Sequence, residues 1–119
     1  MKKYLLFFVV LLGCSKEEIS EVDYFSGKLV KKGICMLYVI QVNDPDFPQD
    51  LIEKSWTDEF SNKKYKNVFA LESVCDFPET IKKNDSFNFV INNDKENNCT
   101  VCLAYTPVPN KYISISVLD

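Results

Sequence analysis

The sequence predicts a small all-β domain, an antiparallel barrel or sandwich, which follows a secretory signal. Short runs of alternating apolar and polar residues recur along most of the chain, and turn-forming residues separate them. No alternation of strands with long helices is visible. The chain has 119 residues, which allows one domain.

We expect about six short strands, at residues 24–30, 34–42, 66–71, 86–92, 99–105 and 111–118. The second has apolar residues on both faces, which is typical of a central strand. Alternation in the fourth and sixth places these side chains inward: Phe87, Phe89, Ile91, Ile113, Ile115 and Val117.

Residues 43–61 interrupt this rhythm. Pro45 and Pro48 exclude a central strand, because proline cannot donate to the ladder. The apolar residues between positions 50 and 60 have roughly helical spacing. We therefore expect one inserted loop or short helix between two strands.

The N-terminus has the layout of a signal peptide. Lys2 and Lys3 precede the apolar run at residues 4–12, which is far shorter than the about 20 residues of a membrane-spanning helix. The run ends in Leu11-Leu12-Gly13-Cys14, which resembles the lipobox of bacterial lipoproteins. The resemblance implies cleavage before an acylated Cys14, with residues 1–13 as the signal peptide and 14–22 as a lipidated tether. From the strand pattern we expect residues 23–119 to form a single β-barrel domain.

The start of the tether bears on location. Ser15-Lys16-Glu17-Glu18 resembles the surface-export signal of Bacteroidetes-type lipoproteins, a lysine followed by two acids. The resemblance implies a lipid-anchored protein of the outer membrane that faces outward. A plain charged linker would give the same pattern.

Composition argues against several classes of function. Loss of residues 1–13 removes two of the 14 basic residues and leaves 12 lysines against 17 acids, a balance of −5, with no arginine or histidine in the chain. An acidic domain has no electrostatic footprint for nucleic acid. Histidine, which is the commonest general base and the commonest metal ligand in proteins, is also missing. We expect no enzyme, no metal and no cofactor.

Four cysteines remain once Cys14 carries lipid: Cys35, Cys75, Cys99 and Cys102. Small exported domains are commonly stapled by disulfides, so we expect two. The spacing leaves three connectivities open. An extended Cys99–Cys102 segment would hold its α-carbons about 10 Å apart, beyond the about 7 Å that a bridge tolerates. A zinc site or a redox pair at this C-x-x-C is a weaker alternative.

The order of these elements also resembles small Bacteroidetes-type lipoproteins with an OB-like barrel, over most of residues 27–118. The matching motifs are Gly33-Ile34-Cys35 leading into Tyr38-Val39-Ile40, Phe77-Pro78-Glu79 with Lys82-Lys83-Asn84-Asp85, Phe87-Asn88-Phe89, Cys102 and residues 112–118. The resemblance implies an OB-like barrel of undefined function. It also implies pairing of Cys35 with Cys102, which leaves Cys75 with Cys99. The insertion at residues 43–64 and cysteines 75 and 99 depart from the pattern.

Three aromatic residues fall in the insertion: Phe47, Trp56 and Phe60. They form either an exposed contact patch or a lid packed onto the barrel, and we favour the lid. The patch would suit a non-catalytic binding or interaction module for a protein or glycan ligand. The alternative function is an inhibitor or defence lipoprotein of the lysozyme-inhibitor type.

Overall fold

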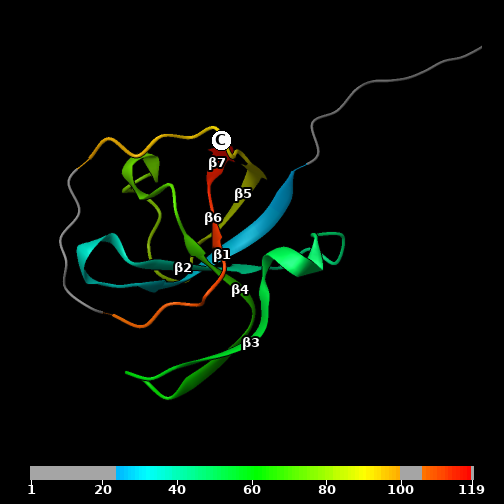
Figure 1. The fold of residues 1–119 in the computed structure, drawn as a ribbon, viewed down its shortest axis with the longest axis vertical. Coiled ribbons are helices and arrows are strands. Elements are labelled where there is room, and N and C mark those ends of the chain that lie inside the picture. The colour runs from blue at the N-terminus through cyan, green and yellow to red at the C-terminus, as the bar shows by residue number, and fades with distance from the viewer. Residues whose placement is uncertain (1–23, 100–105, 119) are drawn as a thin grey trace, which may run out of the picture.

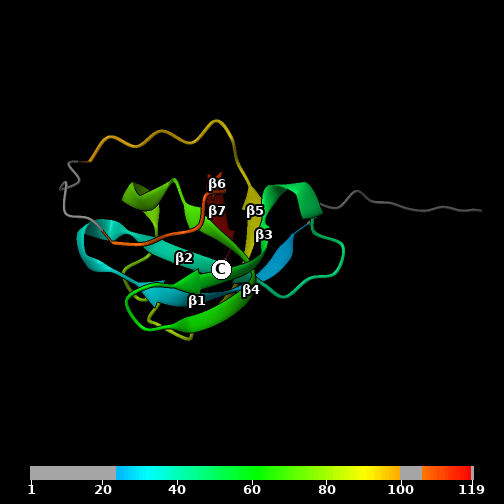
Figure 2. The same ribbon diagram turned by 60° about the horizontal axis from the view of Figure 1, so that its bottom comes forward.

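The protein is all-β, as the sequence predicts (Figures 1 and 2). The computed structural model describes residues 24–99 and 106–118. These contain the strands β1 (Phe25–Lys32), β2 (Tyr38–Val42), β3 (Glu53–Asp58), β4 (Lys63–Leu71), β5 (Ser86–Ile91), β6 (Tyr112–Ile113) and β7 (Ile115–Leu118). Three short 3-10 turns lie between them, η2 (Ile34–Met36), η3 (Gln49–Leu51) and η4 (Val74–Asp76). No helix in the described ranges has the length and apolarity to cross a membrane.

All seven strands belong to one sheet, in the order β3-β4-β2-β1-β5-β7, and β6 branches from β4. Every pairing is antiparallel except that of β6 with β4. The last segment thus contacts β4 through Tyr112–Ile113 and β5 through Ile115–Leu118. The two ends of the path, β3 and β7, do not pair with each other within the described ranges. The sheet is therefore strongly coiled but open, and the predicted barrel is only approximated.

The core lies inside this coil and is rich in aromatic rings. Phe47 is 2% exposed, and its ring centroid is 4.8 Å from that of Phe25, 6.3 Å from that of Phe69 and 6.0 Å from that of Phe89. The inward residues predicted for β5 and for β6 and β7 pack into this cluster, fully buried or at its margin: Phe87, Phe89, Ile91, Ile113, Ile115 and Val117. Burial of such side chains stabilises the fold by about 1.5–3 kcal/mol each.

The predicted second strand begins later than expected. Residues 34–36 form the turn η2, in which Cys35 and Met36 have φ angles of 58° and 63°. This left-handed conformation lets the chain reverse after β1, and the Gly33 N–H donates to the Leu37 carbonyl at 3.0 Å. β2 itself lies between β1 and β4, so the prediction of a central strand is confirmed.

The two faces of β2 belong to different clusters. Ile40 packs in the main core. Val39 lies in a second cluster with Val30 and Val68, which Trp56, Tyr65 and Val108 partly cover. Apolar residues on both faces of β2 therefore reflect burial on both sides of the sheet.

The inserted segment contains a strand where we expected a loop or short helix. Only Gln49–Leu51 forms a 3-10 turn, and β3 follows and pairs with β4. In β3 the side chains alternate, because Ser55 and Thr57 are exposed whereas Trp56 is half-buried and Asp58 is buried. A period of two with Trp and Thr favours a strand over a helix. The predicted strand at 66–71 lies within β4, and most of the one predicted at 99–105 lies outside the described residues.

Candidate functional site at the β3–β4 hairpin

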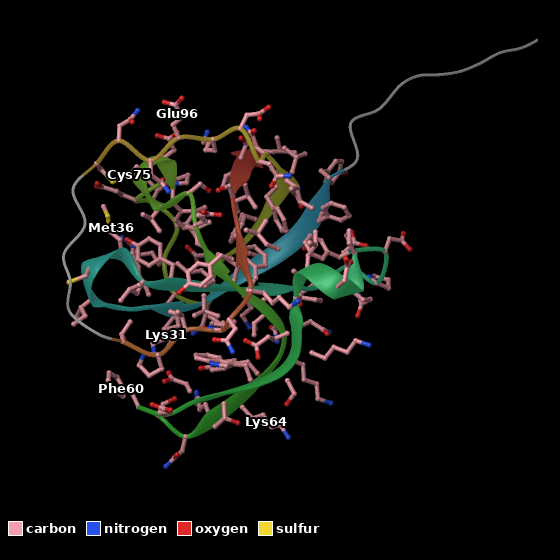
Figure 3. The ribbon with its side chains drawn as sticks, in the orientation of Figure 1. Lys31, Met36, Phe60, Lys64, Cys75 and Glu96 are labelled. Carbon is pink, nitrogen blue, oxygen red and sulfur yellow. A yellow bond between two sulfur atoms is a disulfide. The ribbon has the colours of Figure 1, made fainter. Side chains whose placement is uncertain are left out.

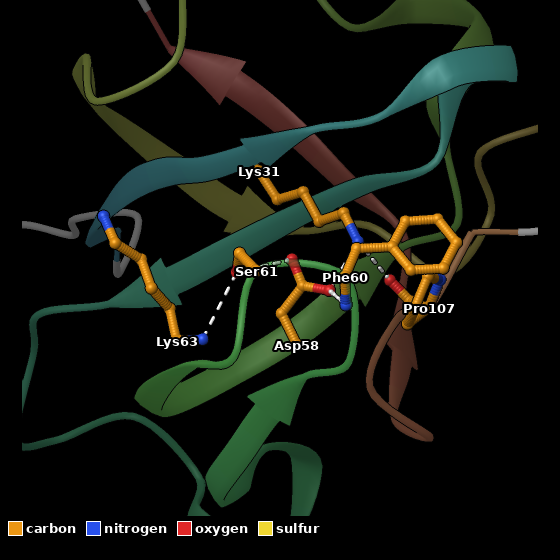
Figure 4. Close-up of polar contacts among 6 residues, drawn as sticks. All are labelled: Lys31, Asp58, Phe60, Ser61, Lys63 and Pro107. Carbon is orange, nitrogen blue, oxygen red and sulfur yellow. Dashed lines mark hydrogen bonds and ion pairs between the residues drawn. The ribbon is translucent and has the colours of Figure 1, made fainter.

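The hairpin of β3 and β4 ends in a turn that Asp58 organises (Figure 4). Its Oδ1 accepts the N–H of Phe60 at 3.0 Å, and its Oδ2 accepts the hydroxyl of Ser61 at 3.3 Å. Its carbonyl oxygen accepts the N–H of Asn62 at 2.7 Å. Asn62 has a φ angle of 61°, a conformation that asparagine tolerates better than most residues. Local hydrogen bonds therefore fix the hairpin tip.

Lys31 of β1 reaches this turn from the neighbouring part of the sheet. Its Nζ lies 3.1 Å from Asp58 Oδ1 and donates to the Pro107 carbonyl at 2.9 Å. The two charged side chains are only 13% and 6% exposed. A lysine normally faces solvent, so burial of this one requires such partners.

A register shift in β1 explains how Lys31 comes to this face. Leu29 pairs with Ile40, whereas Lys31 pairs with Val39, because a β-bulge lies between Leu29 and Lys31. Directly paired residues share a face of the sheet. Lys31 therefore lies on the face of Val39, opposite the main core, where Asp58 is located.

The charge of Lys31 also affects the acidity of its partner. Burial alone would raise the pKa of Asp58, but hydrogen bonds from the Phe60 N–H and from Lys31, with the charge of Lys31, lower it below its ordinary value. Burial, with the nearby charge of Asp58, raises the pKa of Tyr65. Asp58 is thus held ionised and bonded, which suits a structural anchor better than a proton donor.

Aromatic rings surround the ammonium group of Lys31. Its Nζ lies 5.7 Å from the ring centroid of Trp56 and 5.3 Å from that of Phe60, within cation–π range. Trp56 stacks on Tyr65 across the hairpin, with centroids 5.9 Å apart and planes at 24°. Phe60 nevertheless stays 65% exposed at the tip, where Figure 3 labels it.

The predicted contact patch is therefore only partly assembled. Trp56 and Phe60 meet around Lys31, but Phe47 is buried in the main core and contributes nothing to an exposed surface. The reason is that Phe47 follows the turn at Asp44–Pro45, which directs it toward Phe25 and Phe69. We favoured packing of these aromatic residues onto the barrel as a lid over an exposed patch. Phe47 is packed in this way, whereas Phe60 stays exposed.

Lysines gather on the same hairpin. Lys54, Lys63, Lys64 and Lys66 are all exposed, and the ion pairs found within residues 24–99 and 106–118 involve none of them. Lys64 is paired with Thr57, and Lys66 with Ser55. The two pairs lie on one face of the hairpin. We call this face the lysine face, and it consists of Ser55, Thr57, Lys64 and Lys66.

Sequence reasoning missed both Lys31 and the lysine face. No local signal marks Lys31, because its position depends on the bulge in β1. The alternation of Lys64 and Lys66 was a usable signal, since residues two apart in a strand share a face. The predicted strand starts at residue 66, whereas β4 begins at Lys63. Lys64 therefore falls outside the predicted strand, and its alternation with Lys66 does not enter the prediction.

One predicted disulfide is present. Cys75 and Cys99 are bonded, with α-carbons 5.5 Å apart. Cys35 is also disulfide-bonded, but Cys102 lies outside the described residues, so the Cys35–Cys102 pairing stays a prediction. Cys14 lies outside them as well.

A pocket of about 400 Å³ is lined in part by Cys35 and Cys99. Its walls include Met36, Leu71 and Tyr112, and Glu72 is the one lining residue among those described that has a charged side chain at neutral pH. The described residues contain no group of three or more His, Cys, Asp or Glu side chains that could hold a metal ion. As a binding site, the pocket therefore has a concave surface with one acidic side chain. The hairpin has an exposed aromatic ring, several exposed lysines and a turn fixed by hydrogen bonds.

Comparisons of the chain with protein-family models, with curated proteins and with solved structures found no match.

Proposed function

We propose that this protein is a non-catalytic binding module, held at the bacterial outer membrane by lipid on Cys14, which contacts its partner through the β3–β4 hairpin. The observation that carries the proposal is the 65% exposure of Phe60 on a turn fixed by the Asp58 hydrogen bonds. Rigid, exposed aromatic side chains lose little entropy on binding and often supply most of the binding energy. The partner is a protein or glycan of the envelope or of the surroundings.

The placement of the hairpin supports this role. β1 begins at the upper right of Figure 1, and the hairpin tip, marked by Phe60 in Figure 3, lies at the lower left. A lipid on Cys14 precedes the β1 end of the domain in the chain. The hairpin tip and the start of β1 thus lie at opposite ends of the described part of the chain, an arrangement that would leave the hairpin accessible to a partner outside the membrane.

The contact surface is tested by affinity capture from envelope and host extracts. The bait is the chain from Ser15 onward, which retains every described residue. We expect Phe60→Ala to lose the captured partner while the domain stays folded, with a thermal midpoint lower by no more than about 8 °C, since the lost contact with the Lys31 ammonium group is worth about 0.5–1 kcal/mol. Tyr24→Ala removes another exposed ring, 58% exposed and outside the hairpin, and should retain the partner. Equal capture by both variants would contradict the proposal.

The anchor needs a separate test. Cys14→Ser should abolish incorporation of labelled palmitate and release the protein from the membrane fraction, because stable attachment requires more than one acyl chain. Antibody access on intact cells then reports whether the domain faces outward. Membrane retention of the Cys14→Ser protein would remove the lipid anchor from the proposal.

A second candidate is an inhibitor of the lysozyme type. The narrow hairpin presents an aromatic tip beside Lys63 and Lys64, and glycoside hydrolases of this type carry two carboxyl groups in their cleft. A turnover assay with lysozymes and micromolar domain tests this directly. Undiminished turnover would eliminate the inhibitor and leave the binding module intact.

A further inference from the structure

β3 is an edge strand. It pairs with β4 on one side, and no described segment pairs with its other side. At the start of β3, the side-chain carboxylate of Glu53 accepts the backbone N–H of Asn110. An open edge offers unpaired N–H and C=O groups to another extended chain.

Lysines outnumber acids in the hairpin next to this edge, four to three. On the lysine face, Lys64 and Lys66 are two residues apart in β4, which places their α-carbons about 7 Å from each other and their side chains on the same face. The acids of the hairpin are Glu53, whose carboxylate accepts the Asn110 N–H at the start of β3, Asp58, which Lys31 neutralises, and the exposed Glu59. The whole chain, in contrast, has a net charge of −3. The hairpin is therefore a local positive region on an acidic protein.

Protection of the edge against aggregation does not account for this pattern. Natural edge strands use lysine to discourage pairing, and Lys54 of β3 fits that role. Lys64 and Lys66 belong to β4, one strand in from the edge. Their side chains lie behind Thr57 and Ser55, where a strand added to β3 would bring its own side chains onto the same face.

We propose that β3 accepts an extended acidic peptide segment as an additional strand, whose alternate carboxylates face Lys64 and Lys66. The inference rests on the proposed function, because it names the chemistry of the partner for the same hairpin. Ser55 and Thr57 supply hydroxyl groups between the added strand and the two ammonium groups. On the opposite face, the alternate side chains of the segment adjoin Lys54 and Trp56.

The test uses a blocked peptide of about eight residues with alternating threonine and glutamate, a length typical of one strand. The control peptide has glutamine in place of glutamate. Both are titrated at low salt into the isotope-labelled chain from Ser15, and backbone amide shifts and hydrogen exchange are followed. We expect the acidic peptide to bind about twofold to thirtyfold more tightly than the glutamine peptide, the range expected for two exposed charge pairs.

Two double variants locate the site. Lys64→Gln with Lys66→Gln should weaken binding by about tenfold. Lys82→Gln with Lys83→Gln makes the same charge change in an exposed turn elsewhere and should alter binding by less than about twofold. Binding should also slow exchange of amides in β3 while those of β7 are unaffected, which a purely electrostatic association would not do.

Three results would overturn the inference: no binding of the acidic peptide, equal losses in the two double variants, or binding without protection of β3. None of these affects the proposed function, which stands or falls on capture through Phe60. Loss of capture by Phe60→Ala together with peptide failure would keep the hairpin as the contact surface and reject only the acidic strand.

Discussion

Removal of the ammonium group of Lys31 should destabilise the whole domain. Lys31→Met keeps most of the aliphatic stem against Trp56 and Phe60 but leaves the carboxylate of Asp58 buried without its ion-pair partner. Breaking a buried pair in this way costs about 3–5 kcal/mol. Asp58 retains its hydrogen bonds from Phe60 and Ser61, which lessens the loss. We expect the free energy of unfolding to fall by about 2–3 kcal/mol.

Such a loss is readily measured. For a domain of this size it corresponds to a drop of about 10–20 °C in the thermal midpoint. Urea unfolding can be followed through Trp56, the chain's one tryptophan, which lies beside Lys31, and circular dichroism checks that the whole sheet unfolds with it. Lys32→Met is the matched control, because Lys32 donates from an exposed position to the Ile81 carbonyl. It should change the free energy of unfolding by less than about 0.5 kcal/mol.

Partner variants separate the ion pair from simple packing. Asp58→Asn removes the charge and keeps an oxygen that accepts the Phe60 N–H, and the double variant with Lys31→Met closes a thermodynamic cycle. We expect a coupling energy of about 1 kcal/mol or more between the two sites. A loss below about 0.5 kcal/mol for Lys31→Met, or a coupling energy near zero, would show that the pair does not hold the hairpin in place.

Three further predictions follow from the same contacts. Because the folded-state pKa of Asp58 is lowered, its stabilising contribution is complete above the unfolded value of about 3.9 and disappears as pH falls through the folded pKa; denaturant titrations between pH 7 and 2 should show this step in the native chain and not in Asp58→Asn. Replacement of both Cys75 and Cys99 by serine should cost about 3 kcal/mol in urea unfolding, since the bridge spans 24 residues; an unchanged midpoint would contradict it. Non-reducing peptide mapping of protein from the envelope should link Cys35 to Cys102, and a Cys35 peptide joined to any other cysteine would refute that pairing.

The sequence was sufficient to predict the strands whose alternation is strong. In β5 and β7, apolar residues two apart lie on the same inward face of the strand. The alternation alone therefore identifies the segment as a strand and shows which of its residues point inward. The segment around Trp56 was harder, because a few apolar residues in a short run fit a helix turn and a strand equally well. Pairing with β4 decides between them, and that pairing is not local.

Burial of Phe47 could not be predicted for a similar reason. It lies in a loop between two prolines, where no periodicity exists, and loops with polar residues usually lie at the surface. The space it fills is created by Phe25, Phe69 and Phe89, which are distant in the chain. The sequence can supply a list of aromatic residues, but only the topology decides which of them complete the core.

The position of Lys31 shows how one backbone irregularity joins fold to candidate function. In a regular strand Lys31 would share the face of Leu29, which packs in the main core, and its charge would be buried there without an acid. The bulge between the two residues moves Lys31 to the face of Val39. There it meets Asp58, which also holds the N–H of Phe60. The rigidity of the exposed ring at the hairpin tip thus depends on a register shift in β1, a strand that does not pair with the hairpin's outer strand β3.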